Sequence, residues 1–149
     1  MEVFVIAPGG MKPWWAFLAA GLVLVAVFTL LALSVMGSRW ARFEISRDQL
    51  RIRGDFYGRR VPAAALRAAE SRRVDLNASA EFRPRLRTWG TGLPGYQSGW
   101  FRLRNGEKAL VYLTDRSKAI YVPTTEGYSL LLSPDDPDGF LQALRTVVR

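Results

Sequence analysis

The sequence predicts a mainly β domain that is closed by a C-terminal helix and preceded by one membrane-spanning helix. Three features of the 149 residues indicate this arrangement. A long uncharged apolar run stands near the start, short alternating segments separated by turn residues fill the middle, and an apolar stripe of helical period ends the chain. We therefore expect an N-terminal lead over residues 1–13, a transmembrane helix over 14–36 and a folded domain over 39–149.

The apolar run from Trp14 to Met36 contains no charged residue. As a helix it would be about 35 Å long, which exceeds the roughly 30 Å hydrocarbon core of a bilayer. A cleaved signal peptide is disfavoured because its apolar core is only about 7–15 residues long. A soluble core helix is disfavoured because a helix that is apolar all round needs a larger domain to bury it. We expect a permanent single-pass anchor.

The net charge of +8 belongs to the part of the chain after this run. Only Lys12 lies close before the run, whereas five arginines follow it closely: Arg39, Arg42, Arg47, Arg51 and Arg53. Cytoplasmic flanks of spanning helices are enriched in Lys and Arg. We therefore expect a cell-membrane protein with its N-terminus outside and its C-terminal domain in the cytoplasm.

The middle of the chain alternates between apolar and polar residues. Phe43 and Ile45, then Leu50 and Ile52, share one side of a predicted hairpin, and a third short strand follows at 59–62.

Further strands are expected in the second half of the domain. An extended segment over 70–76 precedes four strands, at 100–103, 109–113, 119–122 and 128–132, with short links that predict an antiparallel meander. About seven strands in all would curl into a partly open barrel that protects its edges. Residues 77–99 are expected to be irregular, because their second half is rich in glycine and contains Pro94.

The chain ends on an amphipathic helix. Asp136 is placed to cap it, and Pro137 suits its first position. Its apolar stripe consists of Phe140, Leu141, Leu144, Val147 and Val148. We expect this helix to cover apolar surface that the strands leave open.

Several segments together resemble the bacterial pleckstrin-homology (PH) domain family in its membrane-anchored form. They are Gly90–Tyr96 (GTGLPGY), Gly99–Phe101 (GWF), Gly106–Leu110 (GEKAL), Thr114-Asp115, Tyr128–Ser133, Asp136-Pro137 and Phe140-Leu141. The resemblance implies a partly open barrel of two antiparallel sheets with one end closed by the C-terminal helix. It also implies a binding or scaffold module, and it specifies no ligand.

Clusters of arginine are the candidate lipid-binding residues. They are Arg47, Arg51, Arg53, Arg59, Arg60, Arg72 and Arg73. Each basic residue near an anionic leaflet contributes on the order of 1 kcal/mol. The alternative is a solvated face that only keeps the domain soluble. In phosphoinositide-binding relatives a basic residue after the first strand precedes a basic-x-basic triplet, and Arg47 with Arg51 and Arg53 has that spacing.

The glycine-rich segment supplies the candidate partner-binding residues. They are Trp89, Gly90, Gly92, Leu93, Tyr96 and Trp100. The glycine spacing matches neither a dinucleotide fingerprint nor a phosphate-binding P-loop. Two interpretations stay open: the glycines permit positive φ and close backbone packing, or the segment contacts a partner.

Composition argues against catalysis. The sequence has no histidine and no cysteine, and its carboxylates lie among arginines, which lower the pKa of neighbouring acids. We expect no enzyme activity, no metal and no cofactor, and the membrane anchor argues against a nucleic-acid role. The main hypothesis is a membrane-anchored scaffold that engages a membrane protein through the glycine-rich segment, a strand edge or the anchor helix. The alternative is binding of anionic phospholipid headgroups through the arginines.

Overall fold

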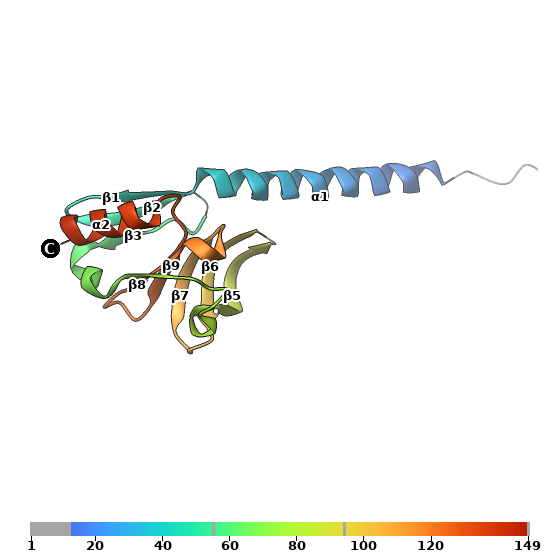
Figure 1. The fold of residues 1–149 in the computed structure, drawn as a ribbon. Helices are drawn as coiled ribbons and strands as arrows, with labels where there is room; N and C mark the ends of the chain where they lie inside the picture. Colours follow the sequence, from blue (N-terminus) through green and yellow to red (C-terminus); the bar gives the residue numbers. More distant parts are fainter. Residues whose placement is uncertain (1–12, 55, 94, 149) are drawn as a thin grey trace, which may run out of the picture. The chain divides into compact units, whose positions relative to one another are not determined.

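The computed structural model describes residues 13–54, 56–93 and 95–148. The chain divides into two compact units, Met1–Ser34 and Val35–Arg149, which are described separately below. Figure 1 traces the elements in order. Apart from Pro13, the predicted N-terminal lead lies outside the described residues.

The first element is the helix α1 (Trp14–Trp40), which has 27 residues. Its segment Trp14–Leu33 is long and apolar enough to cross a membrane, and none of it is buried within the structure. The polar side chain of Thr29 is satisfied inside the helix, since its hydroxyl donates to the Val25 carbonyl at 2.8 Å. The predicted apolar helix is therefore present, and it continues beyond Met36.

The domain begins with a three-stranded antiparallel sheet. Its strands are β1 (Arg42–Ile45), β2 (Gln49–Arg53) and β3 (Arg60–Pro62), in the order β1-β2-β3. The predicted hairpin is confirmed, with Phe43 opposite Ile52 and Ile45 opposite Leu50. Because side chains alternate along a strand, these apolar residues face the core and their neighbours face outward.

A six-stranded sheet forms the rest of the domain. Its strands are β4 (Arg72–Val74), β5 (Pro84–Leu93), β6 (Tyr96–Leu103), β7 (Lys108–Leu113), β8 (Ala119–Pro123) and β9 (Ser129–Leu132). Their order is β4-β8-β9-β7-β6-β5.

The predicted meander is wrong at its end, because β9 lies between β8 and β7 and runs parallel to β7. Every residue of β9, which reads Ser-Leu-Leu-Leu, is buried. A strand that is apolar on both faces is stable only in the interior of a sheet. The β7–β8 connection includes the short 3-10 helix Arg116–Lys118 and leaves room for the inserted strand.

The expectation of an irregular segment before residue 99 is also wrong in its second half. β5 runs without a break through Leu93 and pairs with β6 in a long antiparallel hairpin. The glycines Gly90 and Gly99 lie opposite each other, and both have positive φ. The pairing of β5 with β6 has two register shifts, one between Pro84 and Leu86 and one between Arg87 and Trp89. Irregularities of this kind bend a strand and increase its twist.

The C-terminal helix α2 (Pro137–Val147) forms as predicted. The Asp136 carboxylate accepts a hydrogen bond from the Gly139 amide at 3.0 Å, which caps the helix. Phe140, Leu141 and Leu144 are buried. The ring of Phe140 meets Phe43 of β1 edge to face, with centroids 6.0 Å apart.

The predicted fold class is confirmed: the domain is mainly β, with two sheets and a C-terminal helix, and an apolar helix precedes it. The described residues form nine strands instead of about seven. One apolar cluster joins the first sheet, α2 and one face of the second sheet, and another covers the opposite face. Burial on both faces explains why the central strands are continuously apolar.

Candidate binding site

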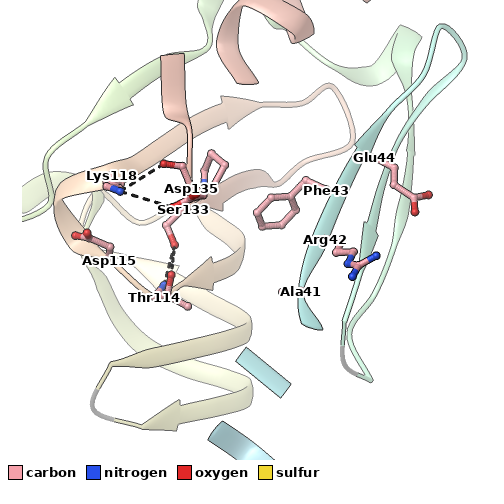
Figure 2. Close-up of a pocket in the computed structure, with 10 residues that line it drawn as sticks. Ala41, Arg42, Phe43, Glu44, Thr114, Asp115, Lys118, Ser133 and Asp135 are labelled. Carbon is pink, nitrogen blue, oxygen red and sulfur yellow. Dashed lines mark hydrogen bonds and ion pairs between the residues drawn. The ribbon is translucent and has the colours of Figure 1, made fainter. Parts of the chain in front are cut away.

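A groove of about 740 Å³ opens between the two sheets. Residues Ala41–Glu44, at the start of β1, form one wall. The opposite wall combines Thr114, Asp115 and Lys118 from the β7–β8 connection with Ser133–Asp135 from the β9–α2 connection. Figure 2 shows the ring of Phe43 projecting from β1 toward this second wall. The volume lies in the range typical of ligand sites, roughly 300–1,000 Å³.

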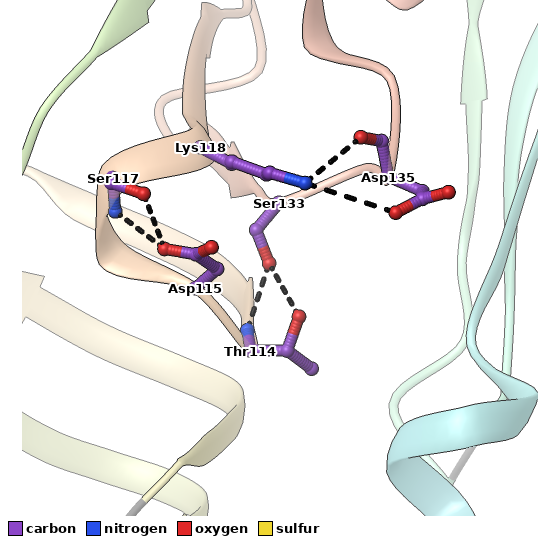
Figure 3. Close-up of polar contacts among 6 residues, drawn as sticks. All are labelled: Thr114, Asp115, Ser117, Lys118, Ser133 and Asp135. Atoms are coloured by element: carbon purple, nitrogen blue, oxygen red, sulfur yellow. Dashed lines mark hydrogen bonds and ion pairs between the residues drawn. The ribbon is translucent and has the colours of Figure 1, made fainter.

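Hydrogen bonds hold the second wall in place. The Ser133 hydroxyl accepts from the Thr114 amide at 2.8 Å and lies 3.1 Å from the Thr114 hydroxyl. Lys118 Nζ lies 3.4 Å from the Asp135 carbonyl oxygen and 3.8 Å from its carboxylate. Figure 3 shows these contacts joining the β7–β8 connection to the segment before α2. The two connections therefore form one continuous polar surface.

The wall contributed by β1 is a free strand edge. β1 is the terminal strand of its sheet and pairs only with β2 among the described residues. In an antiparallel pair, successive residues point their backbone groups alternately toward and away from the partner. The Ser46 amide donates to the Gln49 carbonyl, so Glu44 and Arg42 also face β2. The backbone groups of Phe43 and Ile45 consequently face away from β2.

The charges around the groove are mixed. Arg42 and Lys118 supply positive charge, while Glu44, Asp115 and Asp135 supply negative charge. Hydrogen bonds from the Ser117 hydroxyl and amide lower the pKa of the Asp115 carboxyl, which keeps it ionised and an acceptor at neutral pH. Within the described ranges no three metal-ligating side chains gather. This chemistry suits a polar or backbone ligand better than a single ion.

The arginines that the sequence proposed for lipid binding do not form one site. Arg51, Arg53 and Arg60 lie on the outward face of the first sheet, where Arg51 is directly opposite Arg60. Arg47 lies in the β1–β2 turn, at the opposite end of the hairpin from Arg53. The phosphoinositide-type triplet of Arg47, Arg51 and Arg53 therefore does not converge on one point.

The remaining predicted arginines have partners within the domain. Arg59 lies over the rings of Trp100 and Tyr128, at 5.5 and 5.3 Å from their centroids. Arg72 lies similarly over Phe82 and Tyr121, at 5.1 and 5.5 Å.

Cation–π contacts of this kind stabilise by about 0.5–2 kcal/mol and orient the guanidinium groups. Arg73 is 3.6 Å from the Asp138 carboxylate on α2. Through these contacts, Arg59, Arg72 and Arg73 pack against other residues of the domain.

The predicted residues of the glycine-rich segment differ in their exposure. Trp89 is exposed and Leu93 is half-buried, whereas Tyr96 is buried. Trp100 packs edge to face on Tyr128, with ring centroids 5.0 Å apart. The contacts of Trp100 are internal, so Trp89 is the exposed aromatic that the predicted set offers to a partner.

Sequence reasoning missed the groove. In the sequence, Thr114 and Asp115 contribute only to the family resemblance, and Ser133 only ends one of the segments that carry it. The signal was weak because the groove joins segments far apart in sequence, and a free edge is not visible before the strand order is known. Phe56, in the β2–β3 loop, is also exposed, and nothing in the sequence around it predicts that.

Comparison with known proteins agrees with the architecture. A family model described as a bacterial PH domain matches residues 41–148, which is more than two thirds of the chain. Searches of curated proteins and of solved structures found no significant match.

Proposed function

The chain belongs to the bacterial PH domain family, and we propose that it is a membrane-anchored, non-catalytic binding module that engages another membrane protein. In this proposal α1 crosses the cell membrane with the N-terminus outside, and the domain over residues 39–149 lies in the cytoplasm. Support comes from the apolar segment Trp14–Leu33 and from the excess of arginine that follows it.

The free edge of β1 inside the groove is the observation that carries the proposal. An extended peptide can add to such an edge through backbone hydrogen bonds, with side-chain pockets supplying specificity. β1 offers the outward backbone groups of Phe43 and Ile45, and the facing wall offers Thr114 and Ser133 hydroxyls. The groove therefore provides both sides of a strand-binding cleft.

The connection of the domain to α1 indicates which class of protein it binds. Ala41, which lines the groove, follows directly on Trp40 at the end of α1. A partner that is itself embedded in the membrane presents the segment next to its own span at a raised local concentration. We infer that the groove binds such an extended juxtamembrane segment.

Site-specific photocrosslinking tests this function. A photoreactive phenylalanine replaces Asp135 in the groove, and in a control chain it replaces Arg104, which is exposed in the turn after β6. We expect the groove position to crosslink one membrane protein at residues just outside its span. Equal yields from the two positions, or crosslinks confined to lipid, would contradict the proposal. The topology is checked separately with a C-terminal reporter, which must be active only on the cytoplasmic side.

A further inference from the structure

The two edge strands of the six-stranded sheet differ in length. At one edge β4 has 3 residues, whereas at the other edge β5 has 10. Among the residues that the structure describes, β5 pairs only with β6. Proteins usually keep edge strands short, charged or bulged, because their unpaired backbone groups can pair with another chain. The length of β5 makes it a large open edge.

The two halves of β5 differ in these protective features. Both register shifts lie before Trp89, and so do the two charged residues of the strand, Arg85 and Arg87. Residues 89–93 pair with β6 in unbroken register and carry no charge. Bulges and charges are the features that prevent pairing at an edge. The second half of β5 therefore has neither of them.

One face of β5 carries an uncharged stripe. Leu86 and Trp89 are three residues apart, so in a regular strand they would face opposite sides. The register shift between Arg87 and Trp89 places them opposite alternate residues of β6, so both lie on one face. The pairing extends this stripe along the strand to four residues: Leu86, Trp89, Thr91 and Leu93.

The stripe is exposed to solvent in its longest side chains. Leu86 is 59% exposed and Trp89 is 68% exposed. Apart from Phe56, they are the large apolar side chains that the described part of the domain leaves exposed. Arg87 lies on the other face of the strand, where a Cβ added at Gly92 would be 3.5 Å from its Nη1 atom. The charge of β5 is therefore kept off the stripe.

The unpaired backbone groups in this half of β5 belong to glycines. A Cβ added at Gly99 would lie only 2.6 Å from the Gly90 Cα. Such close approach is typical of a non-hydrogen-bonded pair, in which the backbone groups face away from the partner strand. Because the direction alternates along the strand, the amide and carbonyl of Gly90 and of Gly92 face away from β6.

We propose that residues 89–93 of β5 pair antiparallel with the same residues of a second copy of this chain. The twofold axis passes through Thr91, which lies opposite Thr91 of the other copy. Gly90 of each copy lies opposite Gly92 of the other, and these glycines exchange backbone hydrogen bonds. Trp89 of each copy lies opposite Leu93 of the other. The two copies thus use the same surface, as in most homodimers.

The residues of β5 are complementary to themselves in this register. Aromatic and threonine side chains in directly opposite positions stabilise a pair of strands, whereas like charges destabilise it. The register brings Trp89 onto Leu93 and Thr91 onto Thr91, and it leaves Arg85 and Arg87 outside the paired segment. No arginine of one copy therefore lies opposite an arginine of the other.

The dimer is separate from the proposed peptide site. It uses the edge of β5, whereas the groove uses the edge of β1 in the other sheet. The dimer therefore holds or fails independently of the protein partner. Two linked copies present two grooves, and a partner that carries two binding segments would be held more tightly by both than by one.

Disulfide crosslinking of the full chain in phosphatidylcholine vesicles tests the register. The sequence has no cysteine, so Thr91→Cys introduces a single thiol at the twofold axis. Opposite residues of a non-hydrogen-bonded pair have Cα atoms about 4.5 Å apart, within the range of about 4.4–6.8 Å that a disulfide spans. Thr88→Cys is the control, because the two copies of residue 88 would be about 20 Å apart. After oxidation, Thr91→Cys should give about tenfold more linked dimer than Thr88→Cys.

A charge exchange at the same position tests the contact without oxidation. Donor and acceptor fluorophores are attached at Thr125→Cys, an exposed position outside the interface, and energy transfer reports association. Thr91→Arg and Thr91→Asp each place like charges opposite each other at the axis, so each variant alone should lose the transfer. A mixture of the two variants should restore it. Restored transfer also shows that both variants are folded.

Three results would overturn the proposal. One is the absence of a linked dimer from Thr91→Cys, and another is an equal yield from Thr88→Cys. The third is unchanged energy transfer in chains with Thr91→Arg, which would assign the association to another surface such as α1. The disulfide result decides the question if either charged variant does not fold.

Discussion

Gly99 lies opposite Gly90 in the β5–β6 hairpin, so close that a Cβ added at Gly99 would be 2.6 Å from the Gly90 Cα and 2.5 Å from the Trp89 carbonyl oxygen. Gly99 also has a φ of 113°, a value that residues with a Cβ rarely adopt. The two glycines thus let the strands approach where a side chain would separate them. Between the two interpretations of the glycine-rich segment, this geometry supports a backbone role for Gly90.

Gly99→Ala is therefore expected to destabilise the domain by about 1–3 kcal/mol, because the new methyl group meets backbone and the φ is strained. Gly92→Ala is the control. Its Cβ would lie 3.5 Å from Arg87 Nη1, which is an ordinary contact. Urea unfolding of the full chain in detergent measures both variants. Equal urea midpoints for the two variants would show that the close approach of Gly99 to Gly90 does not contribute to the stability of the domain.

Asp136→Ala is expected to lower the free energy of unfolding by about 1 kcal/mol, because it removes the hydrogen bond to the Gly139 amide at the start of α2. Asp138→Ala removes the same charge from the same turn but leaves the cap intact. Its exposed ion pair with Arg73 should contribute only about 0–1 kcal/mol. Thermal unfolding compares the two, and a larger loss for Asp138→Ala would contradict the capping assignment.

Local pattern was enough to predict α1, the β1–β2 hairpin and α2. Each of these depends on residues near one another in sequence, such as the alternation of Phe43 and Ile45 or the Asp136-Pro137 start. The position of β9 was not predictable in this way, since the parallel pairing of Leu130 with Leu110 is a long-range contact. Four strands in succession that are each rich in apolar residues are compatible with several orders.

The sites were harder to predict than the fold. The sequence identified Arg51, Arg53 and Arg60 as candidates, but it could not show that they share a face while Arg47 lies at the other end. It also could not show that the Arg59 guanidinium group makes cation–π contacts with the rings of Trp100 and Tyr128. The groove needed the order of both sheets, which depends on packing between distant segments.

Alkaline pH is expected to destabilise the domain through Tyr128. Burial, and then the hydrogen bond from its hydroxyl to the Glu126 carboxylate, raise the pKa of Tyr128 from 10.0 to about 12. The folded state therefore keeps a proton that the unfolded state has lost, and unfolding becomes more favourable as pH rises through this window. The contribution is fully present below pH 10 and is lost as pH approaches 12.

Tyr128→Phe provides the reference for this effect. The wild-type free energy of unfolding should fall more steeply than that of the variant between pH 10 and pH 12, and tyrosinate absorbance should include one group titrating late. The difference between the two chains cancels the titration of lysines and of other tyrosines. If the free energies of unfolding of the two chains fall in parallel with pH, burial does not raise the pKa of Tyr128.

Hydrogen exchange at β1 tests the central claim, that the free edge of this strand is where the protein partner binds. In the chain alone, the amides of Phe43 and Ile45 should exchange much faster than the Glu44 amide, which faces β2. In the complex captured by the groove crosslinker, these two amides should slow to the rate of the Glu44 amide. Fast exchange that persists at Phe43 and Ile45 in that complex would contradict strand addition at β1.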